Sequence, residues 1–158
     1  MRHAKVEKRI VKPDTIYNSP IVAKMINYIM IDGKKTVAQE QVYKALALLE
    51  EKGKGSAMEL FDKALSNAGP KVEVKAKRIG GANYQVPIEV RPERRTALAL
   101  RWIIEAARKR PNREYHTFAE KLAAELLDVI AGQGEAIRKK ELALRQAEAN
   151  KAFSHFRW

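Results

Sequence analysis

Cysteine is absent from this 158-residue sequence, which excludes disulfide bonds, thiolate nucleophiles and thiolate metal ligands together. Long apolar runs are absent as well, and none approaches the roughly 18 residues that a membrane-spanning helix needs. The first ten residues are too charged to form a secretory signal. No Walker loop, dinucleotide fingerprint or metal-ligand spacing of histidines is present. The sequence therefore predicts a cytoplasmic protein with no catalytic residue, no cofactor, no metal site, no small-molecule substrate and no membrane partner.

Acidic residues are too few to balance the basic ones. The 31 Lys and Arg residues stand against 19 Asp and Glu, which gives a net charge of +12 and an isoelectric point near 10.0. Such an excess is typical of a protein with a polyanionic partner. Residues 13–70 are neutral and residues 114–137 carry a net charge of −4. The excess lies in four segments with a net charge of +4 each: 1–12, 71–95, 96–113 and 138–158. This distribution predicts one basic side and one supporting side.

Six segments place apolar residues at helical spacing. The first is expected to begin at Pro20, with Ser19 as its N-cap, and to stop at Asp32-Gly33. Capping-box spacing opens the second and third helices, at Thr36 with Gln39 and at Ser56 with Glu59, and Gly53 and Gly69-Pro70 end them. The remaining helices are expected at about 92–109, 118–130 (capped by Thr117 with Glu120) and 135–149. The residues expected to be buried on the first four helices are Val22, Met25, Ile26, Ile29, Val42, Ala45, Leu46, Leu49, Phe61, Ala64, Leu65, Ala68, Leu100, Ile103, Ile104 and Ala107.

Between the third and fourth helices the apolar period changes from 3.6 to 2, which predicts a β-hairpin over residues 71–90. A two-residue Gly80-Gly81 loop would mix apolar and polar side chains on each face of the ribbon. A three-residue loop over residues 79–81 would instead pair Val74 with Val86 and keep the faces separate. We therefore expect the three-residue loop, because opposed residues share a face.

These elements predict a mainly α-helical protein: a six-helix bundle with a projecting two-stranded antiparallel β-hairpin arm and an extended basic N-terminal arm. Residues 1–158 are expected to form a single domain. It divides into the extended arm at 1–19, helices at 20–70, the hairpin at 71–90, helices at 91–150 and an aromatic, basic tail at 151–158.

The fourth helix carries the clearest candidate binding surface. Arg94, Arg101 and Arg108 lie seven residues apart and share one flank, where guanidinium groups can bind successive phosphates. Four further residues are expected on the side away from the core: Arg91, Arg95, Trp102 and Lys109. A solvated basic face is the alternative, but Glu105 is the only acid in residues 96–113, so nucleic-acid contact is favoured. For Trp102, packing against the hairpin or a tail is at least as well supported as base stacking.

The hairpin is a second candidate, because a projecting ribbon with basic residues near its tip resembles arms that contact nucleic acid. The alternative is a ribbon packed back onto the bundle, and both can hold if Val74, Val86 and Ile88 rest on the body. The acidic residues Glu120, Glu125 and Asp128 are expected on a solvated helix face rather than in an acid–base pair.

Several segments then identify a family. Residues 80–90 (Gly-Gly-Ala-Asn-Tyr-Gln-Val-Pro-Ile-Glu-Val), Arg94-Arg95 and Arg101-Trp102 closely resemble the bacterial small-subunit ribosomal protein seven. So do Pro13-Asp14, Asp32-Gly33-Lys34-Lys35, Leu126-Leu127-Asp128 and residues 148–158. The resemblance runs from about residue 12 to the C-terminus, and Thr15 departs from it where the family usually has a proline.

The resemblance implies a structural protein of the small ribosomal subunit that binds the 3′ domain of 16S rRNA and nucleates assembly of the head. It also implies a position at the subunit interface near the exit-site tRNA and the mRNA path, with small-subunit ribosomal proteins nine and eleven as neighbours. The implied rRNA-binding residues are Arg2, Lys5, Lys8, Arg9, Lys34, Lys35, Arg94, Arg95 and Arg101. The positions on the fourth helix add Arg91, Trp102, Arg108 and Lys109 to the predicted rRNA-binding residues. The hairpin residues implied near tRNA and mRNA are Lys75, Lys77, Arg78, Gly80, Gly81 and Asn83.

Two other functions are alternatives to a ribosomal role: DNA binding and RNA modification. An architectural DNA-binding protein with a basic β-arm would have a similar charge and similar elements, and competition between RNA and duplex DNA separates the two. An RNA-modifying enzyme would need an active site for which the sequence offers no candidate.

Overall fold

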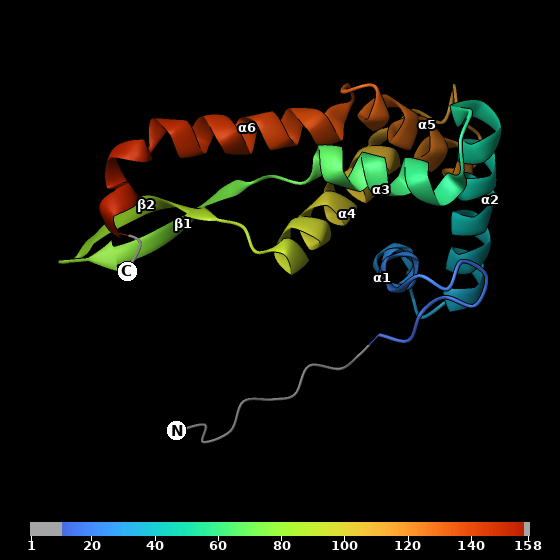
Figure 1. Cartoon of the computed structure of the whole chain (residues 1–158), viewed down its shortest axis with the longest axis horizontal. Coiled ribbons are helices and arrows are strands. Elements are labelled where there is room, and N and C mark those ends of the chain that lie inside the picture. Colours follow the sequence, from blue (N-terminus) through green and yellow to red (C-terminus); the bar gives the residue numbers. More distant parts are fainter. Residues whose placement is uncertain (1–10, 157–158) are drawn as a thin grey trace, which may run out of the picture.

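The computed structural model describes residues 11–156, and the predicted basic arm is therefore tested only from residue 11 onward. Within these residues the chain forms six α-helices, one antiparallel hairpin and a short 3₁₀ helix (Figure 1). Their bounds are α1 Pro20–Ile29, α2 Lys35–Gly53, α3 Ala57–Ala68, β1 Val72–Ile79, β2 Ala82–Glu89, α4 Pro92–Lys109, α5 Phe118–Ile130, α6 Glu135–Ala149 and η1 Lys151–Phe156. The six predicted α-helices and the hairpin are confirmed, and η1 is a seventh helix that the apolar spacing did not indicate.

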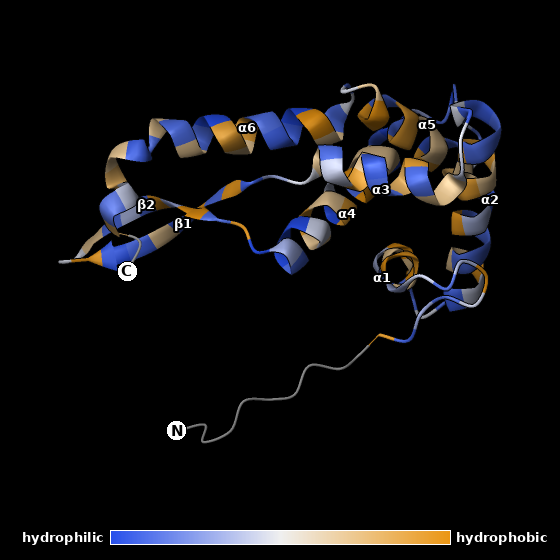
Figure 2. Cartoon of the chain, in the orientation of Figure 1, coloured by the Kyte–Doolittle hydropathy of each residue, from blue (hydrophilic) through white to orange (hydrophobic). Residues whose placement is uncertain are grey.

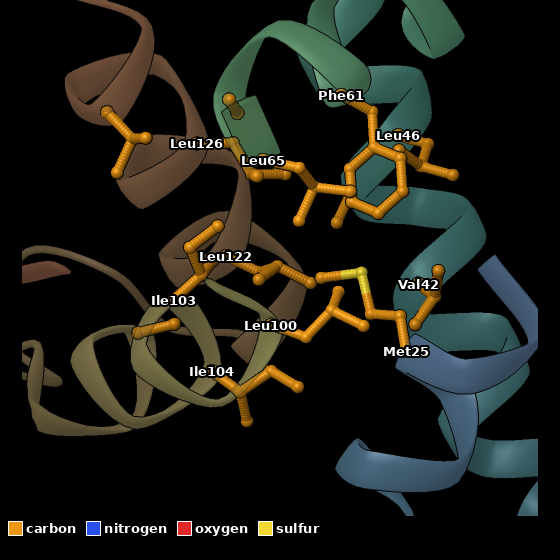
Figure 3. Packing of buried hydrophobic residues seen from close by; sticks show 14 of the residues in the cluster. Met25, Val42, Leu46, Phe61, Leu65, Leu100, Ile103, Ile104, Leu122 and Leu126 are labelled. Atoms are coloured by element: carbon orange, nitrogen blue, oxygen red, sulfur yellow. The ribbon is translucent and has the colours of Figure 1, made fainter. Parts of the chain in front are cut away.

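The core lies where α1 to α5 meet. Figure 3 shows Met25 of α1 reaching between side chains of α2, α4 and α5, with Phe61 of α3 closing the cluster above it. Every residue predicted to be buried on the first four helices is buried. The spacing of three and four residues puts these side chains on one face of each helix, so the bundle forms by bringing those faces together.

The helix starts were predicted with mixed success. Ser19 caps α1 by accepting a hydrogen bond from the Val22 N–H, and Thr117 forms the predicted capping box with Glu120 at the start of α5. The predicted capping box at Thr36 is wrong, because α2 starts at Lys35 with Lys34 as its N-cap residue. Asp32 and Gly33 both have positive φ angles, and this tight turn starts the helix two residues earlier than a cap at Thr36 would. Ser56 does precede α3, but its side chain makes no capping hydrogen bond.

The predicted hairpin register is also wrong. Val74 pairs with Pro87, and Lys75 pairs with Val86, around a two-residue Gly80-Gly81 turn. Both glycines have positive φ angles, 56° and 91°, as the favoured two-residue hairpin turn requires. Each face of the hairpin can carry both polar and apolar side chains, because both faces are covered near the base of the hairpin. Val86 and Pro87 point to opposite faces, and both are buried. The expectation that only one face is buried therefore led to the wrong loop length.

The hairpin does not project alone. α6 runs alongside it and packs against both strands, and η1 folds back onto β2 (Figure 1). Tyr84 of β2 packs against the rings of Phe153 and Phe156, with centroids 5.3 and 5.4 Å away. Figure 2 shows hydrophilic and hydrophobic residues alternating along α6, as expected for a helix that covers the ribbon on one side only. Hairpin, α6 and η1 thus form one arm, and the C-terminal half of α6 belongs to this arm rather than to a six-helix bundle.

A buried ionic cluster joins the base of this arm to the bundle, and here a further prediction is wrong. Glu125, expected on a solvated face, is 1% exposed. Its Oε2 accepts hydrogen bonds from Arg110 Nε (2.9 Å) and from the Arg110 Nη2 (2.6 Å), and its Oε1 accepts one from the Ala136 N–H at the start of α6 (3.2 Å). Asp128 binds the same guanidinium group. Burial lowers the pKa of Arg110, but hydrogen bonds to Asp128 and Glu125 outweigh it and raise the pKa, so the guanidinium stays charged.

Residues 11–19 are held against the bundle. Asp14 is buried and accepts hydrogen bonds from the backbone N–H groups of Ile16 and Tyr17 and from the Tyr43 hydroxyl, 2.6 Å away on α2. The predicted extended arm over 1–19 is therefore folded onto α1 and α2 from Asp14 onward.

Candidate nucleic-acid interface

The outward flank of α4 carries the predicted row of arginines. Arg94, Arg101 and Arg108 are exposed, and consecutive members are separated by about 10.5 Å along the helix axis, since each residue adds 1.5 Å. The opposite flank of the same helix contributes Leu100, Ile103 and other buried residues to the core. Core packing on one flank thus fixes the arginines on the other.

Each arginine of the row also contacts a neighbouring element. Arg94 forms an ion pair with Glu73 of β1 at 3.4 Å, and nearly half of its side chain stays exposed. The Arg101 guanidinium lies over the ring of Tyr28 on α1, with 5.6 Å between Cζ and the ring centroid. Arg108 donates a hydrogen bond to the carbonyl oxygen of Ile29 at the end of α1 (3.1 Å). The row therefore extends from the hairpin base to α1 and has defined side-chain positions along its whole length.

Two more predicted cations continue the row at the α1–α2 connection. Lys34 and Lys35 are exposed at the start of α2. Lys34 lines the same surface pocket as Arg108 and Ile29. The tight turn at Asp32-Gly33 brings this basic pair next to the end of α1. We call Arg94, Arg101, Arg108, Lys34 and Lys35 the α4 basic surface.

At the other end of α4, the hairpin base has mixed charge. Arg91, Arg94 and Lys75 line a shallow pocket of about 700 Å³ together with Glu73 and Glu89. Glu73 interacts with Arg94 and, more weakly, with Lys75 at 3.8 Å. The two cations are well exposed, although only 15% of the Glu73 side chain is accessible. Such partly exposed pairs contribute little to stability, so the cations can exchange their carboxylate partner for a phosphate at modest cost.

The hairpin tip agrees with its prediction only in part. Arg78, Gly80, Gly81 and Asn83 are exposed around the turn. Lys77, predicted with them, is only half-exposed and donates a hydrogen bond through Nζ to the Phe156 carbonyl oxygen (3.0 Å). The two-residue turn causes this difference, because it places Lys77 opposite Tyr84 and beside η1.

Three predicted helix-four residues have structural contacts. Arg95 is half-buried and donates hydrogen bonds to the carbonyl oxygens of Gly69 and Ser66 at the end of α3 (both 3.2 Å). Trp102, predicted on the side away from the core, is half-buried and packs against the core cluster instead. Lys109 lies 3.7 Å from Glu105, whose other oxygen is 2.5 Å from Lys139 of α6. The Lys139 hydrogen bond holds the pKa of Glu105 below its usual range, so this carboxylate stays ionised between two ammonium groups.

Two residues of the candidate interface were not predicted from the sequence, and four predicted residues lie outside the described part of the chain. Tyr28 belongs to the exposed side of α1, and only the packing of α1 on α4 brings it to Arg101. Lys139 is one of several basic residues on α6, and nothing in its spacing distinguishes it. The four predicted residues outside the described range are cations of the N-terminal segment: Arg2, Lys5, Lys8 and Arg9.

Residues 11–156 contain neither a metal-binding cluster nor a membrane-spanning helix. No group of three or more His, Asp and Glu side chains in this range could hold a metal ion. No helix in the same range is long and apolar enough to cross a membrane. The fold and surface together define a helical protein whose exposed arginines and lysines are arranged for contact with a polyanion.

Comparison with known proteins identifies the class. A sequence model described as ribosomal protein S7p/S5e matches residues 1–151. The small ribosomal subunit protein uS7 of Acetivibrio thermocellus is 54% identical over 157 residues, which cover 99% of each chain. The uS7 protein of Nautilia profundicola is 51% identical over 158 residues, which cover the whole of both chains. The uS7 protein of Roseobacter denitrificans is 53% identical over 157 residues, which cover 99% of this chain and 98% of the relative. This chain belongs to the ribosomal protein S7p/S5e family.

Proposed function

We propose that this chain is a structural protein of the small ribosomal subunit that binds rRNA through the α4 basic surface. Its relatives are named as small-subunit proteins, and the chain matches them over its whole length. The observation that carries the proposal is the row formed by Arg94, Arg101 and Arg108, which is exposed and continued by Lys34 and Lys35. Cations at regular spacing on a rigid helix suit the phosphates of a folded RNA.

The finer parts of the proposal follow from the resemblance of the chain to its family. The RNA partner is the 3′ domain of 16S rRNA, and binding there nucleates assembly of the subunit head in the cytoplasmic ribosome. The hairpin tip faces the exit-site tRNA and the mRNA path, and small-subunit proteins nine and eleven are its protein neighbours. The exposed tip residues Arg78 and Asn83 support this assignment, since they remain available when α4 is occupied.

The α4 basic surface is tested by Arg101→Ala. Its affinity for a 3′-domain rRNA fragment is expected to fall by about 1–3 kcal/mol, with the salt dependence reduced by about one counterion. Arg138→Ala is the matched control, because Arg138 is equally cationic and exposed but lies on α6. If both variants bind as tightly as the unaltered chain, while circular dichroism reports an intact fold, α4 does not form the interface.

The hairpin tip is tested by a shortened ribbon. Deleting Arg78, Ile79, Ala82 and Asn83 leaves Gly80-Gly81 as the turn between Lys77 and Tyr84, which already face each other. We expect the shortened chain to bind the rRNA fragment normally but to alter tRNA and mRNA contacts in assembled subunits. Equal losses of both would contradict this division of labour.

An architectural DNA-binding role is the second candidate from the charge pattern, and membership of a ribosomal protein family does not favour it. Competition decides between the two polyanions. The rRNA fragment is expected to displace a labelled DNA duplex at equal salt, and tighter binding of a generic duplex would favour DNA.

A further inference from the structure

A surface pocket lies where α1 ends, α2 begins and the last turn of α4 meets the start of α5. Its volume is about 380 Å³, within the size range of sites that hold small ligands. Ile31 and Val37 form exposed parts of its wall, with 60% and 53% of their surfaces accessible. Single exposed aliphatic residues are common on proteins, but two beside one cavity form a local apolar surface. We call this cavity the α1–α2 pocket.

The polar side chains of the pocket are cationic or neutral, and none of its lining residues is acidic. Lys34 and Arg108, both members of the α4 basic surface, stand at its edge. Arg108 is held in place by the Ile29 carbonyl oxygen. Gln41 is oriented as well, because its Oε1 accepts the Ala119 N–H at 3.1 Å and directs the other end of the amide elsewhere. Apolar walls with fixed positive charge call for a ligand that is both apolar and anionic.

The planar groups narrow the choice of ligand. Phe118 lines the pocket with an aromatic ring, and Arg108 adds a flat guanidinium group. Unstacked RNA bases bind proteins by stacking on aromatic rings and guanidinium planes, and their phosphates bind nearby cations. An acidic amphipathic helix would satisfy the charge but would make no use of two planar faces.

We propose that the α1–α2 pocket takes one unstacked nucleobase of the bound RNA, with the flanking phosphates on Lys34 and Arg108. This inference rests on the proposed function and deepens it. An RNA strand that follows Arg101 and Arg108 along α4 reaches the pocket at its next contact, because Arg108 belongs to both. It follows that the RNA is looped or bulged at this point, since a base inside a duplex stays stacked and cannot enter.

The experiment separates the apolar contribution from the charge contribution. The double variant Ile31→Ser/Val37→Ser removes the apolar wall from two exposed positions, and Leu142→Ser on α6 is its control, with a comparable exposure of 55%. Binding of the double variant to the 3′-domain rRNA fragment is expected to be about tenfold weaker, as for loss of one stacked base. Its salt dependence is expected to match that of the unaltered chain, whereas Lys34→Gln should lower the slope by about one counterion.

Contact is tested directly with a photoreactive benzophenone side chain at position 37 in the full chain. It is expected to cross-link the rRNA fragment at one unpaired nucleotide, and the same group at position 142 should give no discrete cross-link. Unchanged affinity of the double variant, or capture of an acidic helical peptide at position 37 without competition by RNA, overturns the inference. If the unaltered chain fails to bind the rRNA fragment, the proposed function fails. If it binds and the double variant binds equally well, only the pocket assignment fails.

Discussion

Replacing Glu125 by Gln tests whether the buried ionic cluster holds the arm onto the bundle. Glu125 is the member of this cluster that contacts both sides: one oxygen binds Arg110 at the end of α4, and the other binds the Ala136 N–H at the start of α6. The substitution keeps the size of the side chain. It removes the negative charge and puts an N–H₂ group where one of the two acceptors stood.

The expected loss can be worked out from these contacts. Removing one partner of a buried ion pair costs about 3–5 kcal/mol, because the other charge is left without compensation. Arg110 keeps Asp128 as a partner, and 16% of its side chain is accessible to water, so the lower end of the range applies. We expect the free energy of unfolding to fall by about 3 kcal/mol. Asp128→Asn is the matched control: 46% of that side chain is exposed, and its loss should cost less than about 1 kcal/mol.

Urea unfolding gives the free energies by linear extrapolation. Hydrogen exchange at the Ala136 amide adds a local measurement, and this amide should exchange faster in the Glu125 variant only. Equal losses in the two variants would refute the assigned role of Glu125. So would an Ala136 amide that exchanges at its original rate, because the arm would then be held by other contacts.

Three further predictions concern the bundle and the arm. Burial raises the pKa of Asp14, but hydrogen bonds from Tyr43 and the backbone outweigh it and hold the pKa below its ordinary value of 3.8. The resulting stabilisation is complete above pH 3.8 and is lost as the pH falls through the lower folded pKa. As the pH is lowered, the free energy of unfolding should therefore fall less steeply for Asp14→Asn than for the unaltered chain. Arg95→Ala should lower the unfolding temperature more than Arg94→Ala does, because Arg95 binds two carbonyl oxygens of α3, and titration with rRNA should give the reverse order for affinity. Tyr84→Ala should speed hydrogen exchange across residues 151–156, and unchanged exchange there would show that the ring contacts do not hold η1.

The bundle could be predicted from the sequence because its signals are local. Apolar residues spaced three and four apart identified the buried faces of α1 to α4, and a capping box fixed the first residue of α5. The arm could not be predicted in the same way. Its register follows from Gly80-Gly81 together with coverage of both faces. The α6 and η1 contacts that provide this coverage come from residues far along the chain, such as Phe156, which lies 79 positions from Lys77. Residues of that separation leave no periodic signal in either segment.

In the candidate interface, too, the sequence predicted what depends on local spacing and missed what depends on packing between elements. The spacing of Arg94, Arg101 and Arg108 put them on one flank of α4, and they are all exposed there. Spacing could not separate Arg94 from Arg95, its neighbour in the chain, because the difference lies in the end of α3, which approaches Arg95 only after folding. Nor could it locate Tyr28, or the burial of Glu125, since both depend on how two helices pack.

Partner and exposure together separate Arg95 and Arg110 from Arg94 and Arg101. Arg110 binds a carboxylate that is almost completely buried, so losing this contact leaves a charge unpaired inside the protein. Arg95 binds two carbonyl oxygens at the end of α3, so losing these contacts removes the hydrogen bonds that cap that helix end. Arg94 and Arg101 are exposed and contact Glu73, whose side chain is 15% accessible, and the exposed ring of Tyr28; interactions of such exposed cations are worth about 0–1 kcal/mol. A phosphate can therefore replace or join those partners with little loss of protein stability. The weak surface contacts hold these two side chains against β1 and α1 before RNA arrives, which reduces the entropy lost on binding. The weakly held Arg94 and Arg101 are suited to RNA binding, whereas Arg95 and Arg110 maintain the scaffold that presents them. Arg108 combines the two features, because it is exposed and also binds the Ile29 carbonyl oxygen at the end of α1.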